Sequence, residues 1–339
     1  MKILVTGGTG YIGSHTVVEL QAKGHEVIII DNLSNSNINV LDAIEKISGI
    51  KPEFENFDLA DMAKTEDFFQ RNNDIDGIIH FAAFKAVGES VDNPLMYYRN
   101  NLYSLVNILQ GMKDNSIPNL VFSSSCTVYG QPEELPVNEE APVQKAESPY
   151  GNTKQISEEV IFDTTKASDI KAIALRYFNP IGAHESTEIG ELPLGVPNNL
   201  MPFITQTAIG IREQLSVFGD DYNTPDGTAI RDYIHVVDLA QAHVIAVERM
   251  VNKNMKKDFE YFNLGTGNGY SVLEVIKSFE KVSEQKLNYK IVGRRAGDVE
   301  QVWADTNFAN DELGWKAKKN IDEMTLSAWK WELKLQTEK

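Results

Sequence analysis

Residues 2–13 read KILVTGGTGYIG, an apolar run that passes into a glycine cluster and then into a helical pattern ending near Lys23. The apolar run predicts a strand from Lys2 to Val5. Glycines after a strand let the backbone turn tightly and approach a ligand, and the helix N-terminus adds unpaired N–H groups and a partial positive charge. The stretch therefore predicts a parallel α/β sheet with a pyrophosphate-binding turn at its edge.

The glycines of this turn fit two spacings, Gly8-x-Gly10-x-x-Gly13 and Gly7-x-x-Gly10-x-x-Gly13. A glycine triplet alone also fits an ordinary tight turn, so its context decides. The next apolar run, residues 27–30, is typical of a strand buried on both faces, and Asp31 follows it. An acid there hydrogen-bonds a ribose 2′-hydroxyl and repels a 2′-phosphate, so we expect NAD rather than NADP.

Strand-like and helical patterns alternate through the first half of the chain. This alternation implies right-handed crossovers and a doubly wound parallel sheet covered by helices, a Rossmann-type α/β fold. The expected strands are residues 53–57, 77–81, 119–123 and 171–177, and the expected helices include 92–112 and 148–165. Asp58 and Leu59, directly after the third strand, fit either an adenine contact or a helix N-cap.

The pattern loosens after Asn179. Residues 182–202 hold several Pro, Gly and Asn and predict a long irregular loop. We expect short strands at 216–218, 231–236 and 261–264, and helices at 236–250 and 323–333. Two domains follow: residues 1–179 as an NAD-binding Rossmann domain and 180–339 as a smaller mixed α/β substrate-binding domain, with part of 234–264 returning to the first.

The composition excludes several classes of protein. The 339 residues include 32 Lys+Arg and 49 Asp+Glu, and a net charge of −17 would repel nucleic acid and anionic membranes. No apolar run approaches the roughly 20 residues that span a bilayer. Cys126 is the only cysteine, so an internal disulfide is impossible, and the six histidines show no metal-ligand spacing. We expect a cytoplasmic protein with no metal, no nucleic-acid partner and no membrane contact.

Residues 148–154, SPYGNTK, carry the candidate chemistry. Pro149 suits the first turn of a helix, which places Tyr150 and Lys154 on one face. A free tyrosine is a poor base at neutral pH, but a nearby ammonium favours the phenolate and lowers its pKa. We expect Tyr150 to act as a base toward a hydroxyl whose carbon loses hydride. Ser125, near the end of the preceding strand, is placed to hydrogen-bond the reacting oxygen.

With these residues in hand, the chain resembles the extended short-chain dehydrogenase/reductase family, and within it the enzymes that epimerise sugar nucleotides. The resemblance follows the family's order over nearly the whole chain. It is carried by residues 7–15, 31–33, 80–90, 176–180, 197–202, 231–235 and 294–298, together with Tyr150 and Lys154.

The resemblance implies an NAD-dependent isomerase of galactose metabolism that interconverts UDP-galactose and UDP-glucose. NAD takes hydride from C4 of the hexose, the 4-keto sugar rotates, and hydride returns to its other face. Catalysis falls to Tyr150, Lys154 and Ser125. The implied cofactor contacts are Gly7, Gly10, Tyr11, Ile12, Gly13, Asp31, Asn32, Asn35, Ser36, Asp58, Leu59, Phe81, Ala82, Lys85, Asn100, Ser125, Tyr150, Lys154 and Phe178.

The same resemblance implies a UDP-hexose site in the second domain. Arg231 and Arg295 suit a diphosphate because guanidinium groups donate paired N–H bonds. The implied substrate contacts are Ser125, Tyr150, Asn179, Asn199, Leu200, Ser216, Val217, Phe218, Arg231, Arg295, Asp298 and Val302. Members restricted to the plain sugars carry tyrosine where this chain has Val302, so we also expect activity on the UDP-N-acetylhexosamines.

The family further implies a homodimer joined through a four-helix bundle. Its candidate positions are Leu102, Leu105, Val106, Leu109, Ile156, Val160 and Ile161, which fit plain core packing equally well. Another NAD-dependent sugar-nucleotide epimerase or a dehydratase remains the alternative. A dehydratase needs an acid pair directly after the hydroxyl residue, where this chain has Cys126 and Thr127. An NAD-sensing regulator typically lacks the Tyr/Lys pair, and both residues are present here.

Overall fold

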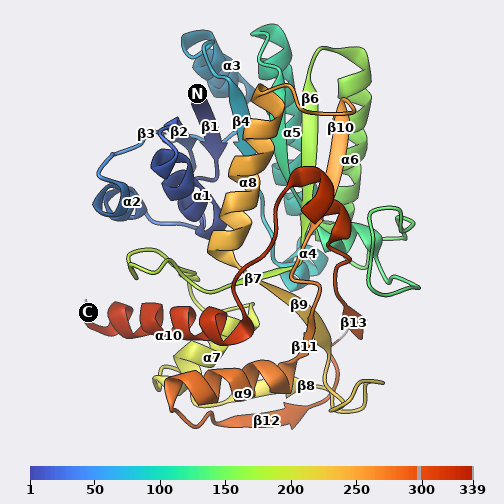
Figure 1. Cartoon of the computed structure of the whole chain (residues 1–339). Coiled ribbons are helices and arrows are strands. Elements are labelled where there is room, and N and C mark those ends of the chain that lie inside the picture. Colours follow the sequence, from blue (N-terminus) through green and yellow to red (C-terminus); the bar gives the residue numbers. More distant parts are fainter. Residues whose placement is uncertain (296–298, 338–339) are drawn as a thin grey trace.

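A seven-stranded parallel sheet forms the larger part of the computed structural model, which describes residues 1–295 and 299–337 (Figure 1). Its strand order is β10-β6-β5-β4-β1-β2-β3. The order reverses between β1 and β4, the point at which sheets of this kind bind ligands. The strands are β1 (Lys2–Thr6), β2 (Glu26–Ile30), β3 (Glu53–Glu55), β4 (Gly77–His80), β5 (Asn119–Ser125), β6 (Lys171–Tyr177) and β10 (Phe259–Leu264).

Helices cover both faces of this sheet, as the near-continuous apolar character of its strands requires. Successive side chains of a strand point to opposite faces, so Ile3 and Val5 enter one core and Leu4 enters the other. The first core is covered by α1 (Tyr11–Ala22), α2 (Val40–Ser48) and α8 (Val236–Val251), and the second by α3 (Met62–Arg71), α5 (Pro94–Asp114) and α6 (Pro149–Ala167). The predicted doubly wound α/β fold is confirmed.

A smaller, mixed part lies beyond the carboxyl ends of the large sheet's strands (Figure 1). Its sheets contain β7 (Asn179–Ile181), β9 (Ile230–His235), β11 (Gly269–Ser271) and β13 (Gln301–Val302), with β8 (Leu215–Phe218) and β12 (Tyr289–Val292) as a separate pair. Its helices are α7 (Leu200–Ala208), α9 (Val272–Ser283) and α10 (Ile321–Thr337), which share a third core. Short helical turns complete the described chain: α4 (Val87–Asp92), η1 (Cys126–Tyr129) and η2 (Ala309–Leu313).

Two long-range returns shape the region around the strand ends. The strand β10 pairs with β6 although more than 80 residues separate them, and α8 packs against α1. Residues 182–199, between β7 and α7, hold no helix or long strand, as their Pro, Gly and Asn content predicts. This segment, which we call the closing loop, runs beside α10 (Figure 1).

Some of the positions predicted for a dimer contact on α5 and α6 belong to the core instead. Leu105, Leu109 and Ile161 are buried against the large sheet, because their sides of α5 and α6 face it. Val106 is exposed on α5 and Phe162 on α6. Within residues 1–295 and 299–337, no helix has both the length and the apolar character to cross a membrane.

Candidate active site

A cavity of about 940 Å³ opens at the carboxyl edge of the large sheet. One wall is formed by the glycine turn and the ends of β2, β4, β5 and β6; the other is formed by the closing loop and α10. Every residue predicted to contact the cofactor lines this cavity, from Gly7 and Asp31 to Lys154 and Phe178. Asn179 and Asn199 from the predicted substrate set line it as well.

The glycine turn is a cradle without room for side chains. A Cβ on Gly13 would lie 2.2 Å from the carbonyl oxygen of Gly7. Gly7 itself has φ +70°, and a Cβ there would lie 2.8 Å from the backbone nitrogen of Ala82. The backbone therefore borders the cavity directly at the start of α1, which fits a pyrophosphate held by N–H groups.

Asp31 closes this cradle from the end of β2. Its carboxylate accepts hydrogen bonds from the backbone N–H of Leu33 at 2.9 Å and of Thr9 at 3.3 Å. The hydroxyl of Ser36 reaches the same carboxylate at 3.3 Å. These bonds fix the acid beside the glycine turn, where an adenine ribose of NAD would sit, so the residues present fit that cofactor.

The Tyr150 and Lys154 pair is positioned by a capped helix start. The Ser148 side chain accepts from the N–H of Gly151 at 3.1 Å, and Pro149 occupies the first turn of α6. Lys154 is 4% exposed, and its Nζ donates to the carbonyl of Ser123 at 2.6 Å. The same Nζ lies 5.9 Å from the centre of the Tyr150 ring. Helix α6 thus presents both side chains to the end of β5.

Burial shifts both groups of this pair toward their neutral forms. It raises the pKa of Tyr150 to about 12, although a hydrogen bond with Ser125 acts to lower it. It lowers the pKa of Lys154 to about 7, with Glu158 acting in the opposite direction. The pKa of Tyr150 is therefore raised, not lowered as the sequence predicts. Desolvation by burial is the largest cause of the shift for both groups.

The three serines that end β5 alternate in direction. Ser123 and Ser125 line the cavity, whereas Ser124 donates to the Glu158 carboxylate at 2.5 Å on the far side. Glu158 in turn accepts from the buried guanidinium of Arg176 at 3.0 and 2.5 Å. This buried pair is fully hydrogen-bonded, so it supports the strand ends without placing an unpaired charge beneath the cavity.

Sequence reasoning missed a polar bridge across the closing loop. The Glu191 carboxylate, with its side chain 12% exposed, lies 3.5 Å from Lys85 Nζ and accepts from Asn199 Nδ2 at 2.5 Å. Lys85 and Asn199 were predicted as cofactor and substrate contacts, but nothing singled out Glu191. Gly190 and Glu191 lie in an irregular segment with no periodic pattern. The only nearby signals in the sequence are residues 176–180 and 197–202, which carry the family resemblance.

Most of the remaining predicted substrate contacts do not line this cavity. Leu200, Ser216, Val217, Phe218, Arg231, Arg295 and Val302 belong to the smaller part, and Asp298 lies outside the described residues. Val302 pairs with Arg231 in the β13–β9 register and packs in a buried cluster with Phe178. The Arg295 guanidinium lies 5.6 Å from the centre of the Phe218 ring. These residues sit in the smaller part because β8, β9 and β13 pair outside the large sheet.

The residues after Ser125 offer no second acid–base pair. Burial raises the pKa of the Cys126 thiol to about 12, with Arg231 acting to lower it, so the thiol stays protonated at neutral pH. The buried hydroxyl of Thr127 has no hydrogen-bond partner among residues 1–295 and 299–337. In the part of the chain that the structure describes, no group of three His, Cys, Asp or Glu side chains could hold a metal.

A doubly wound sheet with a glycine cradle and a Tyr/Lys pair at one edge defines the class of Rossmann-type dehydrogenase folds. The family model described as GDP-mannose 4,6 dehydratase matches residues 4–327. The UDP-glucose 4-epimerase of Bacillus subtilis (strain 168) is 50% identical over 333 residues, 98% of this chain and 97% of its own length. The chain belongs to the UDP-glucose 4-epimerase family of extended short-chain dehydrogenases/reductases.

Solved structures agree with this placement. UDP-glucose 4-epimerase from Bifidobacterium longum, crystallised with NAD⁺ and UDP, is 46% identical with a TM-score of 0.94, covering 98% of each chain. The UDP-Glc/GlcNAc 4-epimerase from Campylobacter jejuni is 35% identical with a TM-score of 0.84, over 98% of this chain and 99% of that one.

Proposed function

We propose that this protein interconverts UDP-galactose and UDP-glucose by inverting C4 of the hexose, with NAD as a retained cofactor. The observation that carries the proposal is one cavity that joins the glycine cradle, Asp31, Ser125, Tyr150 and Lys154. A relative that is 46% identical over nearly the full length was crystallised with NAD⁺ and UDP, which supports the same ligands here.

The cofactor is held by the sheet-edge wall of the cavity. The glycine turn binds the pyrophosphate, Asp31 binds the adenine ribose, and Lys85, Asn100 and Lys154 surround the nicotinamide end. When bound, NAD supplies the acceptor and then the donor of hydride at C4 of the sugar. Division of the chain follows from this: residues 1–179, with part of 234–264, bind NAD, and residues 180–339 bind the sugar nucleotide.

Proton movement falls to three side chains of the chain itself. The phenolate of Tyr150 would be favoured by the cationic nicotinamide of bound NAD⁺. In that form its Oη takes the proton of the sugar's 4-hydroxyl and later returns it, while the Ser125 hydroxyl hydrogen-bonds the same oxygen. Lys154 holds a positive charge near the phenolate. Because burial lowers the pKa of Lys154 to about 7, the lysine gains or loses its proton near neutral pH and can balance the charge of Tyr150.

The anionic substrate needs local donors, since the whole protein carries a net charge of −17. Asn179 and Asn199 at the cavity offer neutral donors to the sugar and its diphosphate. Arg231 and Arg295 supply paired N–H groups from the smaller part. Between the two proton transfers the 4-keto sugar turns about its bond to the diphosphate, so these donors must hold the nucleotide while the hexose rotates.

Product analysis with no added cofactor tests the proposal. Purified protein incubated with UDP-galactose should yield UDP-glucose, and denatured protein should release NAD or NADH. Incubation with GDP-mannose separates the alternative, because a dehydratase would form a 4-keto-6-deoxy sugar. The proposal fails if UDP-galactose remains unchanged while the protein carries NAD.

We extend the proposal to the UDP-N-acetylhexosamines on the basis of Val302, which packs behind the cavity-lining Phe178. Valine lacks the ring and hydroxyl of the tyrosine that restricted family members carry, and the relative from Campylobacter jejuni is a UDP-Glc/GlcNAc 4-epimerase. Turnover of both substrate pairs by the parent and by Val302→Tyr is the test. Equal handling of the acetylated pair by both proteins contradicts the assignment.

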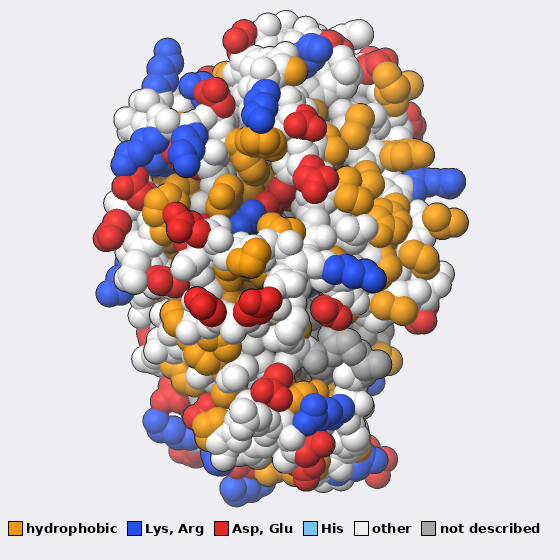
Figure 2. Space-filling view, turned by 90° about the vertical axis from the view of Figure 1, so that its right-hand side faces the viewer, with side chains coloured by type: hydrophobic (Ala, Val, Ile, Leu, Met, Phe, Trp, Pro, Cys, Tyr) orange, Lys and Arg blue, Asp and Glu red, His pale blue; other side chains and the backbone are white. Residues whose placement is uncertain are grey.

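A cytoplasmic homodimer is part of the proposal. Hydrophobic side chains gather on part of the face seen from the α6 side (Figure 2). Exposed members on α5 and α6 include Leu95 (80% exposed), Tyr103, Val106 and Phe162. Pairing these helices with a second copy would cover them. Light scattering should give twice the chain mass, and Val106→Glu with Phe162→Glu should give the monomer. Cell fractionation tests the compartment.

A further inference from the structure

One stripe of helix α10 fastens the closing loop at three places. Ser327, Trp331 and Lys334 are separated by four and three residues, so they lie on one face of the helix. Each of them contacts the segment between Ala183 and Glu191. Trp331 also lines the cavity, so this face of α10 belongs to the wall that the loop closes.

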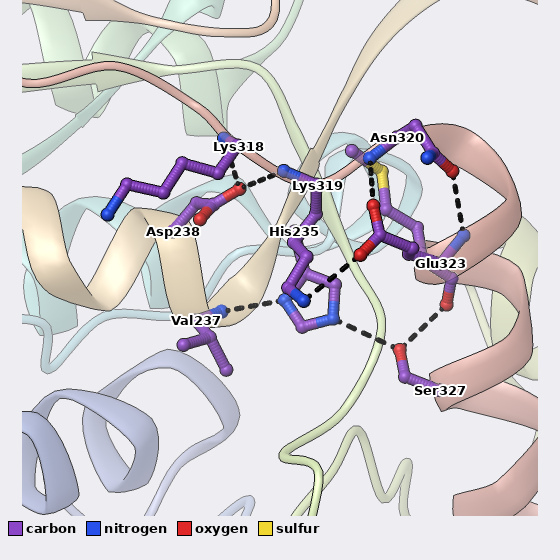
Figure 3. A network of polar contacts seen from close by, with 9 residues as sticks. His235, Val237, Asp238, Lys318, Lys319, Asn320, Glu323 and Ser327 are labelled. Carbon is purple, nitrogen blue, oxygen red and sulfur yellow. Dashed lines mark hydrogen bonds and ion pairs between the residues drawn. The ribbon is translucent and has the colours of Figure 1, made fainter.

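The first fastening holds the root of the loop. The Ser327 hydroxyl accepts from the N–H of Ala183 at 3.1 Å and donates to the carbonyl of Met324 at 2.9 Å. His235 accepts from the N–H of Val237 at its Nδ1, which leaves the proton on Nε2 to be donated to Ser327 (Figure 3). Ser327 is therefore fully bonded, and its position is fixed from β9.

The second fastening is a close stack in the middle of the loop. The Trp331 Nε1–H donates to the carbonyl of Glu191 at 3.1 Å. A Cβ on Gly190 would lie 2.5 Å from Cγ of the Trp331 ring, so only glycine permits this approach. The indole thus fixes the backbone of Glu191, while the carboxylate of Glu191 contacts Lys85 and Asn199.

The third fastening spans the cavity's edge. Glu188 of the loop accepts from Lys334 of α10 and lies 2.7 Å from Nζ of Lys46 on α2. The side chains of Glu188 and Lys334 are 16% and 19% exposed, whereas Lys46 is 65% exposed. Glu188 and Lys46 both line the cavity that holds the glycine turn. The Glu188 carboxylate therefore connects α10 and the closing loop to α2, across the edge of the cavity.

We propose that Glu188, mounted on α10 through Lys334 and joined to Lys46, is a latch that retains NAD in the cavity. The inference rests on the proposed function, because NAD is what the latch retains. The tie must open for a bound dinucleotide to leave between α2 and the closing loop. Charge-assisted hydrogen bonds are the strong ones, and the less exposed Lys334 arm is screened less by salt than the Lys46 arm. These are positioning residues, since they act through the loop and not on the reacting atoms.

The rate of NAD release tests the latch. Loaded protein is mixed with alcohol dehydrogenase and ethanol, which reduce each NAD⁺ that leaves and report it as NADH absorbance. Glu188→Gln and Lys334→Gln should each speed release about tenfold, and Lys46→Gln about threefold, as expected for a partly buried and an exposed arm. Raising the salt concentration should speed release from the parent and leave Glu188→Gln nearly unchanged.

Matched variants separate a latch from general loosening. Lys330→Gln removes the same charge from an exposed position on α10 and should release NAD at the parental rate. Lys46→Arg should keep slow release, and Lys46→Gln combined with Glu188→Gln should be no faster than Glu188→Gln alone. Parental release from a folded Glu188→Gln, checked by circular dichroism, overturns the latch. A parent that carries no NAD and binds none overturns both the latch and the proposed function.

Discussion

Two lysines of the cavity, Lys154 and Lys85, lie in opposite surroundings. On the sheet-edge wall, Lys154 is 4% exposed, its Nζ donates to the Ser123 carbonyl, and burial lowers its pKa to about 7. The Lys85 side chain, from the segment after β4, is 46% exposed and faces Glu191 of the closing loop. A desolvated lysine with a pKa of about 7 can change its charge near neutral pH. The sheet-edge wall is built for proton movement, and the loop wall, formed by the closing loop and α10, for holding charge and closing.

This contrast predicts that changes to the sheet-edge wall reduce activity far more than changes to the loop wall. Tyr150→Phe should give the largest loss, about 10²- to 10⁴-fold in turnover, because it removes the proton acceptor and keeps the ring. Steady-state turnover of UDP-galactose measures it. Tyr289→Phe, which removes a hydroxyl from an exposed strand, is the control. Near-parental turnover by Tyr150→Phe would contradict the assignment of Tyr150 as the proton acceptor.

Gly13→Ala tests the cradle on the same wall. The new Cβ would lie 2.2 Å from the Gly7 carbonyl oxygen, so the turn must move. Its N–H groups would then no longer point toward the pyrophosphate. We expect the bound NAD per chain to fall roughly tenfold or more, as for lost charge-assisted hydrogen bonds. Gly88→Ala, where a Cβ meets open space, should keep the parental content. NAD measured after denaturation decides, and an unchanged content in Gly13→Ala would contradict the cradle.

Lys154→Met sharpens the comparison through stability. The folded pKa of Lys154 is about 7 against 10.5 when solvated, so the unfolded chain binds more protons between those pH values and parental stability rises with pH. Methionine carries no ionisable group, so it removes the free-energy cost of burying Lys154. The NAD-free variant should be more stable than the parent at pH 7 by on the order of 4 kcal/mol, a gain that shrinks toward pH 10.

Urea unfolding at several pH values measures this difference. A constant difference between Lys154→Met and its parent across the range would mean that the buried lysine keeps its ordinary pKa. Turnover of the same variant should fall despite its greater stability, since Tyr150 loses the nearby cation. Higher stability with lower activity is what distinguishes a functional buried charge from a structural one.

Glu191→Gln should have the smallest effect, because it alters the solvated wall and keeps an acceptor for Asn199. We expect KM for UDP-galactose to change about two- to fivefold with little change in kcat, as for partly exposed ion pairs. Glu66→Gln, on the exposed face of α3, provides the matched control. A hundredfold fall in kcat would place Glu191 in the chemistry and remove the distinction between the walls.

The sheet-edge wall was largely predictable from sequence because its signals are local. The glycine spacing, the acid after the second strand and the i, i+4 pair Tyr150 and Lys154 each fall within a short segment. Parallel topology then brings the ends of these segments to one edge, so Ser125 joins them. Boundaries shifted slightly: β5 continues to Ser125, and α5 starts at Pro94 because proline suits a first turn.

The loop wall could not be predicted because its contacts join distant segments. Lys46, Glu188 and Lys334 meet although each lies more than 140 residues from the next, and no period or motif marks them. Trp331 falls within the helix predicted at residues 323–333, but nothing in the sequence distinguishes it from its neighbours. The pKa of Tyr150 also escaped prediction, since its direction depends on how dry the folded site is.

The bridge from Glu191 to Lys85 and Asn199 has a consequence for selectivity in a crowded cell. The chain supplies its own anion to these two donors, and that carboxylate is tethered beside them. A tethered group acts at an effective concentration on the order of millimolar or higher. Free phosphate, sulfate and stray carboxylates must therefore compete with an internal rival that never diffuses away. Only a ligand that gains many further contacts in the cavity can displace the Glu191 carboxylate. Small anions that make few contacts are therefore excluded even when the cavity is open.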